Sequence, residues 1–305
     1  MNYQMLLLAH DAFYKFETRA NHYDNFMANK NPELWDSPSL PDGEVDNLFD
    51  FIIRWDRFFT GQKELFKEAY SSNFNEIQYL SERTFFEIDL DDENVQKYIE
   101  NIFNAFATCN RSRQYESTDA SKLAHAMNPD LFIMWDSSIR EGLFGVKDEK
   151  SADKYVFEFL PLMKTELQEL LASCMKGNNL SERDAYGLLE TICGNSVPKL
   201  IDQYNYMTYT MRTMFGAYLE NISDEKKEIK SKPFTESISF WKNRVPTRNH
   251  KDRKRTRQFI ETINEFRKLE VITVIERREY NEKWRKYPED RDYWFIEVTQ
   301  LLKKI

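Results

Sequence analysis

The stretch STDASKLAHAMNPDLFIMWDSSIREGLFG (residues 117–145) contains the strongest local signals for structure in this chain. Residues 119–127 have the composition of a short helix. Asn128-Pro129 ends that helix, because proline disfavours the α conformation in the residue before it. The apolar run Leu131–Trp135 then predicts a short extended segment, after which Asp136 opens a second helix. The stretch therefore predicts a carboxylate at a helix N-terminus, delivered there by a buried extended segment.

This arrangement resembles the helix-hairpin-helix DNA glycosylase superfamily, in which an apolar residue precedes a helix-capping catalytic aspartate in a pattern similar to (V)D-[ST]-x-[VI]. Asp136-Ser-Ser-Ile139 matches that pattern, and Lys122 lies near the start of the presumed second hairpin helix. Leu143-Phe-Gly145 resembles the Leu-Gly end of the family's helix. The resemblance is confined to residues 117–145.

Two features differ from the family pattern. The segment RSRQYEST (111–118) stands in place of the glycine-rich hairpin turn, and only 14 residues separate Lys122 from Asp136. The stretch also resembles a distant subgroup with the same fold, the bacterial glycosylases that act on modified cytosines in phage DNA. The pattern of that subgroup accommodates both differences.

The resemblance implies an enzyme that extrudes a base from double-stranded DNA and cleaves its N-glycosidic bond. Breaking this bond builds positive charge on the sugar, and a nearby anion stabilises that charge or positions a water molecule for attack. Asp136 is the candidate for the anion; the alternative is that it only caps its helix. Lys122 is the candidate amine nucleophile, and the alternatives are a phosphate contact or a solvated position on the helix surface.

Three further side chains are candidates for contacts with an extruded base, which is held best against aromatic faces. Trp135 directly precedes the aspartate, and His125 lies one turn from the lysine on the same helix face. Tyr206 can share a helix face with Tyr209. The alternative for all three is structural, with the tryptophan in the core, the histidine partly buried and hydrogen-bonded, and the tyrosine packed between helices.

The composition favours helices. Only eight glycines and nine prolines interrupt 305 residues, of which 41% are hydrophobic, and so few turn-forming residues favour long helices over many short strands. Apolar residues at helical spacing predict helices over residues 44–60 and 92–107, and the three prolines and one glycine of residues 31–44 predict a loop. Helices are also predicted over residues 3–30, 119–127, 137–144, 152–175, 182–193, 198–220 and 253–269.

The charged segment SDEKKEIKSK (223–232) predicts a solvated hinge, after which the composition changes. We divide the chain there into a helical glycosylase-like body (1–225) and a basic C-terminal module (226–305). The module contains β-prone pieces at residues 271–275 and 293–298. The expected fold class is therefore mainly α, with a C-terminal module of α or α+β structure.

Basic residues are concentrated in the last third of an otherwise acidic chain, whose formal net charge is −8. Residues 1–100 contain 9 Lys and Arg against 20 Asp and Glu, whereas residues 201–305 contain 23 against 17. Such a local basic surface is typical of phosphate contacts, and a solvated helix face is the alternative. The candidate DNA-binding residues are Arg253, Lys254, Arg255 and Arg257, together with Arg111 and Arg113 beside the presumed hairpin.

Cysteine and histidine usage gives no sign of a metal site or a cofactor. The three cysteines lack CxxC spacing and the four histidines lack HxH or HxxxH spacing. No stretch approaches the roughly 20 apolar residues of a membrane span. The N-terminal apolar run is short and has no basic region before it, so no signal peptide is predicted and a cytoplasmic protein is expected.

Two functions from different classes follow from these observations. The first is a DNA glycosylase that leaves an abasic site in double-stranded DNA. The alternative is a non-catalytic nucleic-acid-binding or defence-regulatory protein in which Asp136 serves only as a helix cap. A nuclease is not indicated, because no PD…ExK series is visible in the sequence.

Overall fold

Helices make up most of the structure in the described part of the chain, which contains no strand. The computed structural model describes residues 1–31, 37–56, 58–176 and 178–222, all of which except Lys30 and Asn31 belong to one compact unit. The prediction of a mainly α protein is confirmed for these residues. The predicted boundary near residue 225, the C-terminal module and the four basic residues between 253 and 257 lie outside them.

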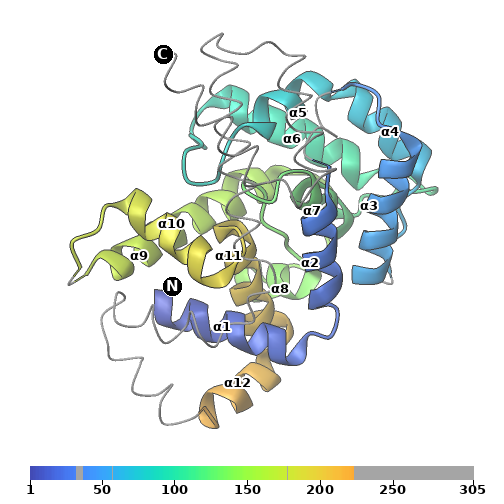
Figure 1. Cartoon of the computed structure of the whole chain (residues 1–305). Coiled ribbons are helices and arrows are strands. Elements are labelled where there is room, and N and C mark those ends of the chain that lie inside the picture. The colour runs from blue at the N-terminus through green and yellow to red at the C-terminus, as the bar shows by residue number, and fades with distance from the viewer. Residues whose placement is uncertain (32–36, 57, 177, 223–305) are drawn as a thin grey trace, which may run out of the picture. The chain divides into compact units, whose positions relative to one another are not determined.

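The described helices pack in two groups, which we call the first and second lobes (Figure 1). The first lobe consists of α2 (Ala20–Asn29), α3 (Asp42–Trp55), α4 (Lys63–Ser72), α5 (Phe74–Ser81), α6 (Glu93–Ala107) and α7 (Ser117–Met127). The second lobe consists of α1 (Tyr3–Phe16), α8 (Ser137–Phe144), α9 (Leu160–Met175), α10 (Glu182–Cys193), α11 (Val197–Asn205) and α12 (Arg212–Glu220). Two π-helical segments, η2 (Tyr155–Phe159) and η3 (Tyr206–Thr210), continue directly into or out of helices of the second lobe.

Several predicted helices are confirmed almost to the residue, because their end signals act locally. Asp136 caps α8, and Gly145 ends it with a φ of 72°, in the left-handed region that glycine adopts without strain. Ser181 caps α10 through a capping box with Asp184. Helix α7 begins at Ser117, two residues before the predicted start.

Other helices differ from the prediction. The helical signal in residues 3–30 corresponds to two helices, α1 and α2, separated by the turn at residues 17–19. The helix predicted over residues 198–220 is interrupted by η3, and α4 and α5 were not predicted at all. In η3 the Met211 N–H donates to the Tyr206 carbonyl at 2.8 Å, a bond that spans five residues instead of four. Such π segments change the direction of the side chains that follow, and amphipathic spacing does not predict them.

An aromatic cluster fills the core where the segment before Asp136 lies. Trp135 is fully buried, and its ring packs against those of Phe103, Tyr155 and Phe159. The Phe103 and Tyr155 rings stack at 4.2 Å between centroids. This packing fixes the backbone that carries Asp136, because buried aromatic rings have little room to move.

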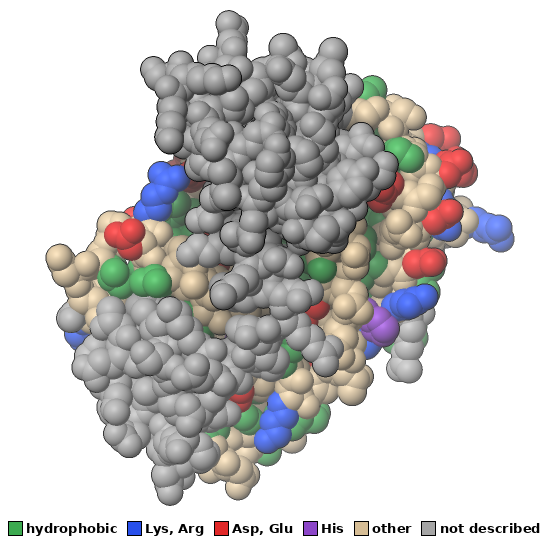
Figure 2. All heavy atoms as spheres, in the orientation of Figure 1, with side chains coloured by type: hydrophobic (Ala, Val, Ile, Leu, Met, Phe, Trp, Pro, Cys, Tyr) green, Lys and Arg blue, Asp and Glu red, His purple; other side chains and the backbone are tan. Residues whose placement is uncertain are grey.

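The surface of the first lobe carries charges of both signs. On the edge formed by α3 and α4, acidic and basic side chains lie interspersed (Figure 2), and Lys63 pairs there with Asp46 at 2.5 Å. Exposed pairs of this kind contribute little to stability. None of the described helices combines the length and the apolar character needed to cross a bilayer.

Candidate functional site

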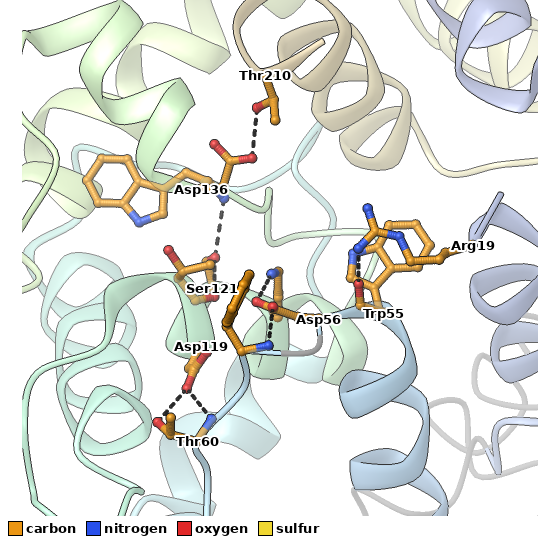
Figure 3. Close-up of polar contacts among 12 residues, drawn as sticks. Arg19, Trp55, Asp56, Thr60, Asp119, Ser121, Asp136 and Thr210 are labelled. Atoms are coloured by element: carbon orange, nitrogen blue, oxygen red, sulfur yellow. Dashed lines mark hydrogen bonds and ion pairs between the residues drawn. The ribbon is translucent and has the colours of Figure 1, made fainter. Parts of the chain in front are cut away.

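Asp136 lies at the N-terminus of α8 with both carboxylate oxygens engaged, one of them by Thr210 (Figure 3). Its Oδ1 accepts a hydrogen bond from the Ile139 N–H at 2.9 Å, and its Oδ2 accepts one from the Thr210 hydroxyl at 2.8 Å. The second contact exists because η3 brings Thr210 back toward α8. The carboxylate is half-buried, held in one orientation, and placed where the helix dipole favours a negative charge.

The backbone before Asp136 is fixed by α7 and α8. The Trp135 N–H donates to the Ser121 hydroxyl at 3.2 Å, and the Trp135 carbonyl accepts from the Arg140 guanidinium at 3.1 Å. Arg140 also donates to the Thr118 hydroxyl at 3.1 Å, and only 5% of Arg140 is exposed. A buried arginine that bonds a carbonyl and a hydroxyl acts here as a brace between α7 and the start of α8.

Lys122 is the sixth residue of α7 and is neither solvated nor free. Its Nζ lies 2.5 Å from the Asp56 Oδ2, and both side chains are about 15% exposed. Burial pushes the pKa of Asp56 up, but the Lys122 ammonium and the Phe58 N–H outweigh this, so that the pKa lies below its ordinary value. The ion pair joins α7 to the end of α3.

A second, fully buried ion pair lies on α11. The Lys199 Nζ is 2.5 Å from the Asp202 Oδ2 and 4.5, 4.6 and 5.1 Å from the ring centroids of Tyr23, Trp55 and Phe13. Burial lowers the pKa of Lys199 and raises that of Asp202. No local sequence pattern marks Lys199 as a site residue, since nothing local shows that helices from both lobes enclose it.

Tyr206 takes part in a third charged group at the turn between α1 and α2. Its hydroxyl donates to the Glu17 Oε2 at 2.8 Å, and Arg19 donates to both Glu17 oxygens at 2.7 Å. Arg19 also donates to the Trp55 carbonyl at 2.8 Å. Burial raises the pKa of Tyr206, and the carboxylates of Glu17 and Asp136 act in the same direction.

These three groups and Asp136 form one polar cluster between the lobes. The Asp136 charge adds to the burial that raises the pKa of Asp202, and the Asp56 charge adds to the Glu17 bonds that raise the pKa of Arg19. We call this set the polar cluster: Glu17, Arg19, Asp56, Lys122, Asp136, Lys199, Asp202 and Tyr206. Among the described residues, no three His, Cys, Asp or Glu side chains converge as a metal site.

Trp135 and His125, the other predicted base contacts, lie in the core instead. Trp135 is 0% exposed and His125 1% exposed. The His125 Nδ1 is 2.7 Å from the Phe132 carbonyl, and its Nε2 is 2.9 Å from the Tyr23 hydroxyl. Trp135 is thus a core residue and His125 a buried, hydrogen-bonded one, which was the alternative to base contact. Neither side chain can contact a ligand unless its neighbours move.

Helices α6 and α7 pack against each other across the loop at residues 108–116; we call the pair the hairpin and its connection the hairpin loop. Asn110 ties this loop together: its amide donates to the Gln114 carbonyl at 2.6 Å, and its Oδ1 accepts from the Gln114 N–H at 3.1 Å. Arg113 has a φ of 54°, so a left-handed position of the kind glycine usually fills is present without a glycine. Arg111 and Arg113 are both exposed, with Arg113 3.7 Å from Glu68.

Asp119 fastens the loop after α3 to α7. Its Oδ2 accepts from the Thr60 N–H at 3.2 Å and from the Thr60 hydroxyl at 3.3 Å, and Asp119 is 7% exposed. Burial raises the pKa of Asp119 to about 6, although Thr60 and Lys122 oppose this. The folded protein therefore binds this proton more tightly than the unfolded chain does, since the ordinary value is 3.8.

The stability of the wild-type protein is expected to include an Asp119 contribution that is present below pH 4 and lost as the pH rises to about 6. In Asp119→Asn this loss is absent, and the amide oxygen still accepts from Thr60. The free energy of unfolding of the variant should therefore rise by up to about 3 kcal/mol relative to that of wild type between pH 4 and pH 7. Urea unfolding at both pH values measures this. The exposed Asp50→Asn serves as control, and a pH-independent difference for Asp119→Asn contradicts the prediction.

Comparison with known proteins does not extend this picture: no family model matches the chain, and no curated protein or solved structure is significantly similar to it.

Proposed function

We propose that this protein is a DNA glycosylase in which Asp136 stabilises the sugar cation formed when an extruded base leaves. The observation that carries the proposal is the half-buried Asp136 carboxylate, fixed by Ile139 and Thr210 at the N-terminus of α8. A rigid anion at a cluster of charged groups is suited to a reaction that builds positive charge, because little reorganisation is needed as the charge develops.

The position of this carboxylate relative to the helical hairpin supports the proposal. The hairpin of α6 and α7 ends in the short buried segment that delivers Asp136, and its loop presents Arg111 and Arg113 to solvent. Exposed arginines bind phosphate groups of DNA, which positions a duplex without reading its sequence. Asp136 and the hairpin loop are thus assigned separate tasks, bond cleavage and backbone contact.

A second candidate function is favoured by one observation. Both Asp136 oxygens are already used in hydrogen bonds within the protein, as expected of a residue that only caps a helix. A non-catalytic DNA-binding protein with the same fold satisfies that observation. The two functions differ in one measurable product, the free base.

The test is a search for free base after the full-length protein is incubated with duplex DNA. The first panel contains duplexes with modified cytosines, to which the sequence resemblance points, and the second contains deaminated, oxidised and alkylated bases. Mass spectrometry of the small-molecule fraction detects the base, and alkali cleavage of the strand locates the abasic site. Binding to DNA without base release from any duplex supports the second candidate.

Borohydride trapping on a substrate duplex is expected to give no covalent adduct through Lys122. A Schiff base requires an amine that is free to attack the sugar, whereas the Lys122 Nζ is held 2.5 Å from the Asp56 carboxylate in an ion pair that is only about 15% exposed. Gel electrophoresis after reduction measures the adduct. A protein–DNA band that disappears in Lys122→Ala but persists in Lys154→Ala makes Lys122 the nucleophile and contradicts this prediction; Lys154 is the control because it too pairs with a carboxylate, that of Glu158.

A further inference from the structure

The loop between α3 and α4 is held at both of its ends to the hairpin region. At one end Asp56 pairs with Lys122 of α7, as described above. At the other end the Gln62 N–H donates to the Cys109 carbonyl at 2.6 Å, and Gly61 and Asn110 form an antiparallel bridge. The loop therefore lies beside the hairpin loop and is fixed there by backbone bonds and an ion pair.

Two phenylalanines follow each other in this loop and differ in environment. Phe59 packs inward, with its ring 5.3 Å from that of Phe49. Phe58 is 74% exposed, more than any other large hydrophobic side chain of the described residues; the others are Ile53, Phe157, Met214 and Tyr79, at 38–50%. The Phe58 N–H donates to the Asp56 Oδ1 at 2.9 Å, so the backbone that carries this ring is fixed to a member of the polar cluster.

The loop that carries Phe58 is joined by its backbone to the hairpin loop, which carries two exposed cations, Arg111 and Arg113. Arg111 directly follows Asn110, which is bridged to the loop that carries Phe58. Two joined loops that present an exposed aromatic ring and exposed arginines are suited to a nucleic acid, since arginines bind phosphates and an aromatic ring stacks on bases.

We propose that Phe58 inserts into the base stack of duplex DNA and fills the space that an extruded base leaves. This inference rests on the proposed function, because it takes double-stranded DNA as the partner of the same site. Apolar side chains that wedge between base steps replace part of the stacking that is lost when a base leaves the helix. Stacking of one base on an aromatic side chain corresponds to about a 5- to 150-fold change in affinity on substitution by alanine.

The test uses a duplex with a stable abasic analogue, tetrahydrofuran, opposite 2-aminopurine, and a matched intact duplex. Because the gap is already present, the identity of the excised base is not needed. Full-length wild-type protein is expected to bind the gapped duplex more tightly and to change the 2-aminopurine fluorescence. In Phe58→Ala the ratio of affinities for the gapped and the intact duplex should fall by about fivefold or more, and the fluorescence change should be lost. Phe58→Trp should retain both.

Phe157→Ala is the matched control, since Phe157 is 49% exposed and lies on η2 rather than on this loop. Thermal melting checks that each variant is folded. Equal preference of folded Phe58→Ala and wild type for the gapped duplex overturns the inference, as does a wild-type protein without any such preference. If the preference depends on Phe58 but no duplex yields free base, the inference stands and the glycosylase proposal fails.

Discussion

The Asp136→Asn protein is expected to fold normally and to release base at least about 100-fold more slowly than wild type. Removal of one preorganised group that stabilises transition-state charge costs on the order of 10²–10³ in rate. Asparagine has nearly the same shape as aspartate but carries no charge, so it does not stabilise a sugar cation. Single-turnover base release on the best duplex of the panel measures the effect.

The fold should persist because asparagine satisfies the same hydrogen bonds. Its amide oxygen can accept from the Ile139 N–H, as the Asp136 Oδ1 does at 2.9 Å. Its amide nitrogen then faces the Thr210 hydroxyl, which rotates to accept instead of donate. Asparagine is also as good an N-cap as aspartate. The melting temperature of the variant should therefore lie close to that of wild type.

A matched substitution separates catalysis from helix capping. Asp92 is also a side-chain N-cap: it accepts from the Asn94 N–H at 2.8 Å at the start of α6, and it does not belong to the polar cluster. Asp92→Asn is expected to release base at the wild-type rate. If Asp136→Asn is as active as Asp92→Asn, Asp136 is only a cap and the proposed mechanism is wrong.

The Lys199→Met protein is expected to lose about 3–5 kcal/mol of unfolding free energy. The substitution leaves the buried Asp202 carboxylate without its cation, in a site where 0% of Lys199 and 5% of Asp202 are exposed. Breaking a buried pair by removing one partner is costly because the remaining charge is uncompensated. Part of the loss also comes from the contacts of the ammonium with the rings of Tyr23 and Trp55. Urea unfolding measures the change.

The double variant Lys199→Met with Asp202→Leu distinguishes a charge effect from a packing effect. With both charges removed, most of the loss should be recovered, since apolar replacements of buried pairs are often neutral. Lys154→Met, which breaks the exposed pair of Lys154 with Glu158 at 3.1 Å, should cost less than about 1 kcal/mol. A double variant as unstable as Lys199→Met alone contradicts the assignment of the loss to the unpaired carboxylate.

The sequence alone predicts those parts of the structure that depend on neighbouring residues. Asp136, Gly145 and the apolar spacing of residues 92–107 act within one or two helical turns, so α6 and α8 are where they were expected. The aspartate at the start of α8 and the hairpin before it follow from the same local signals. These signals also underlie the resemblance on which the functional proposal draws.

The sequence does not predict which side chains meet across the two lobes. Lys199 pairs with Asp202 one turn away, but its burial depends on Phe13, Tyr23 and Trp55, which come from three other helices. Likewise, the hydroxyl of Tyr206, which was a candidate base contact through its aromatic face, donates to Glu17, far away in the sequence.

For the predicted base contacts, too, the sequence does not predict which side chains are buried. Trp135 and His125 have side chains that suit a ligand, yet both are core residues because packing between helices buries them. Lys122 has a side chain that suits a nucleophile, but its environment is set by Asp56, 66 residues earlier in the chain. By itself, therefore, the sequence determined the helices that have clear local signals, such as α6 and α8, and the position of Asp136 at a helix N-terminus, because caps and amphipathic spacing are local. Only the tertiary structure decided which charges are paired and which rings are buried or exposed, because both depend on contacts between segments distant in the chain.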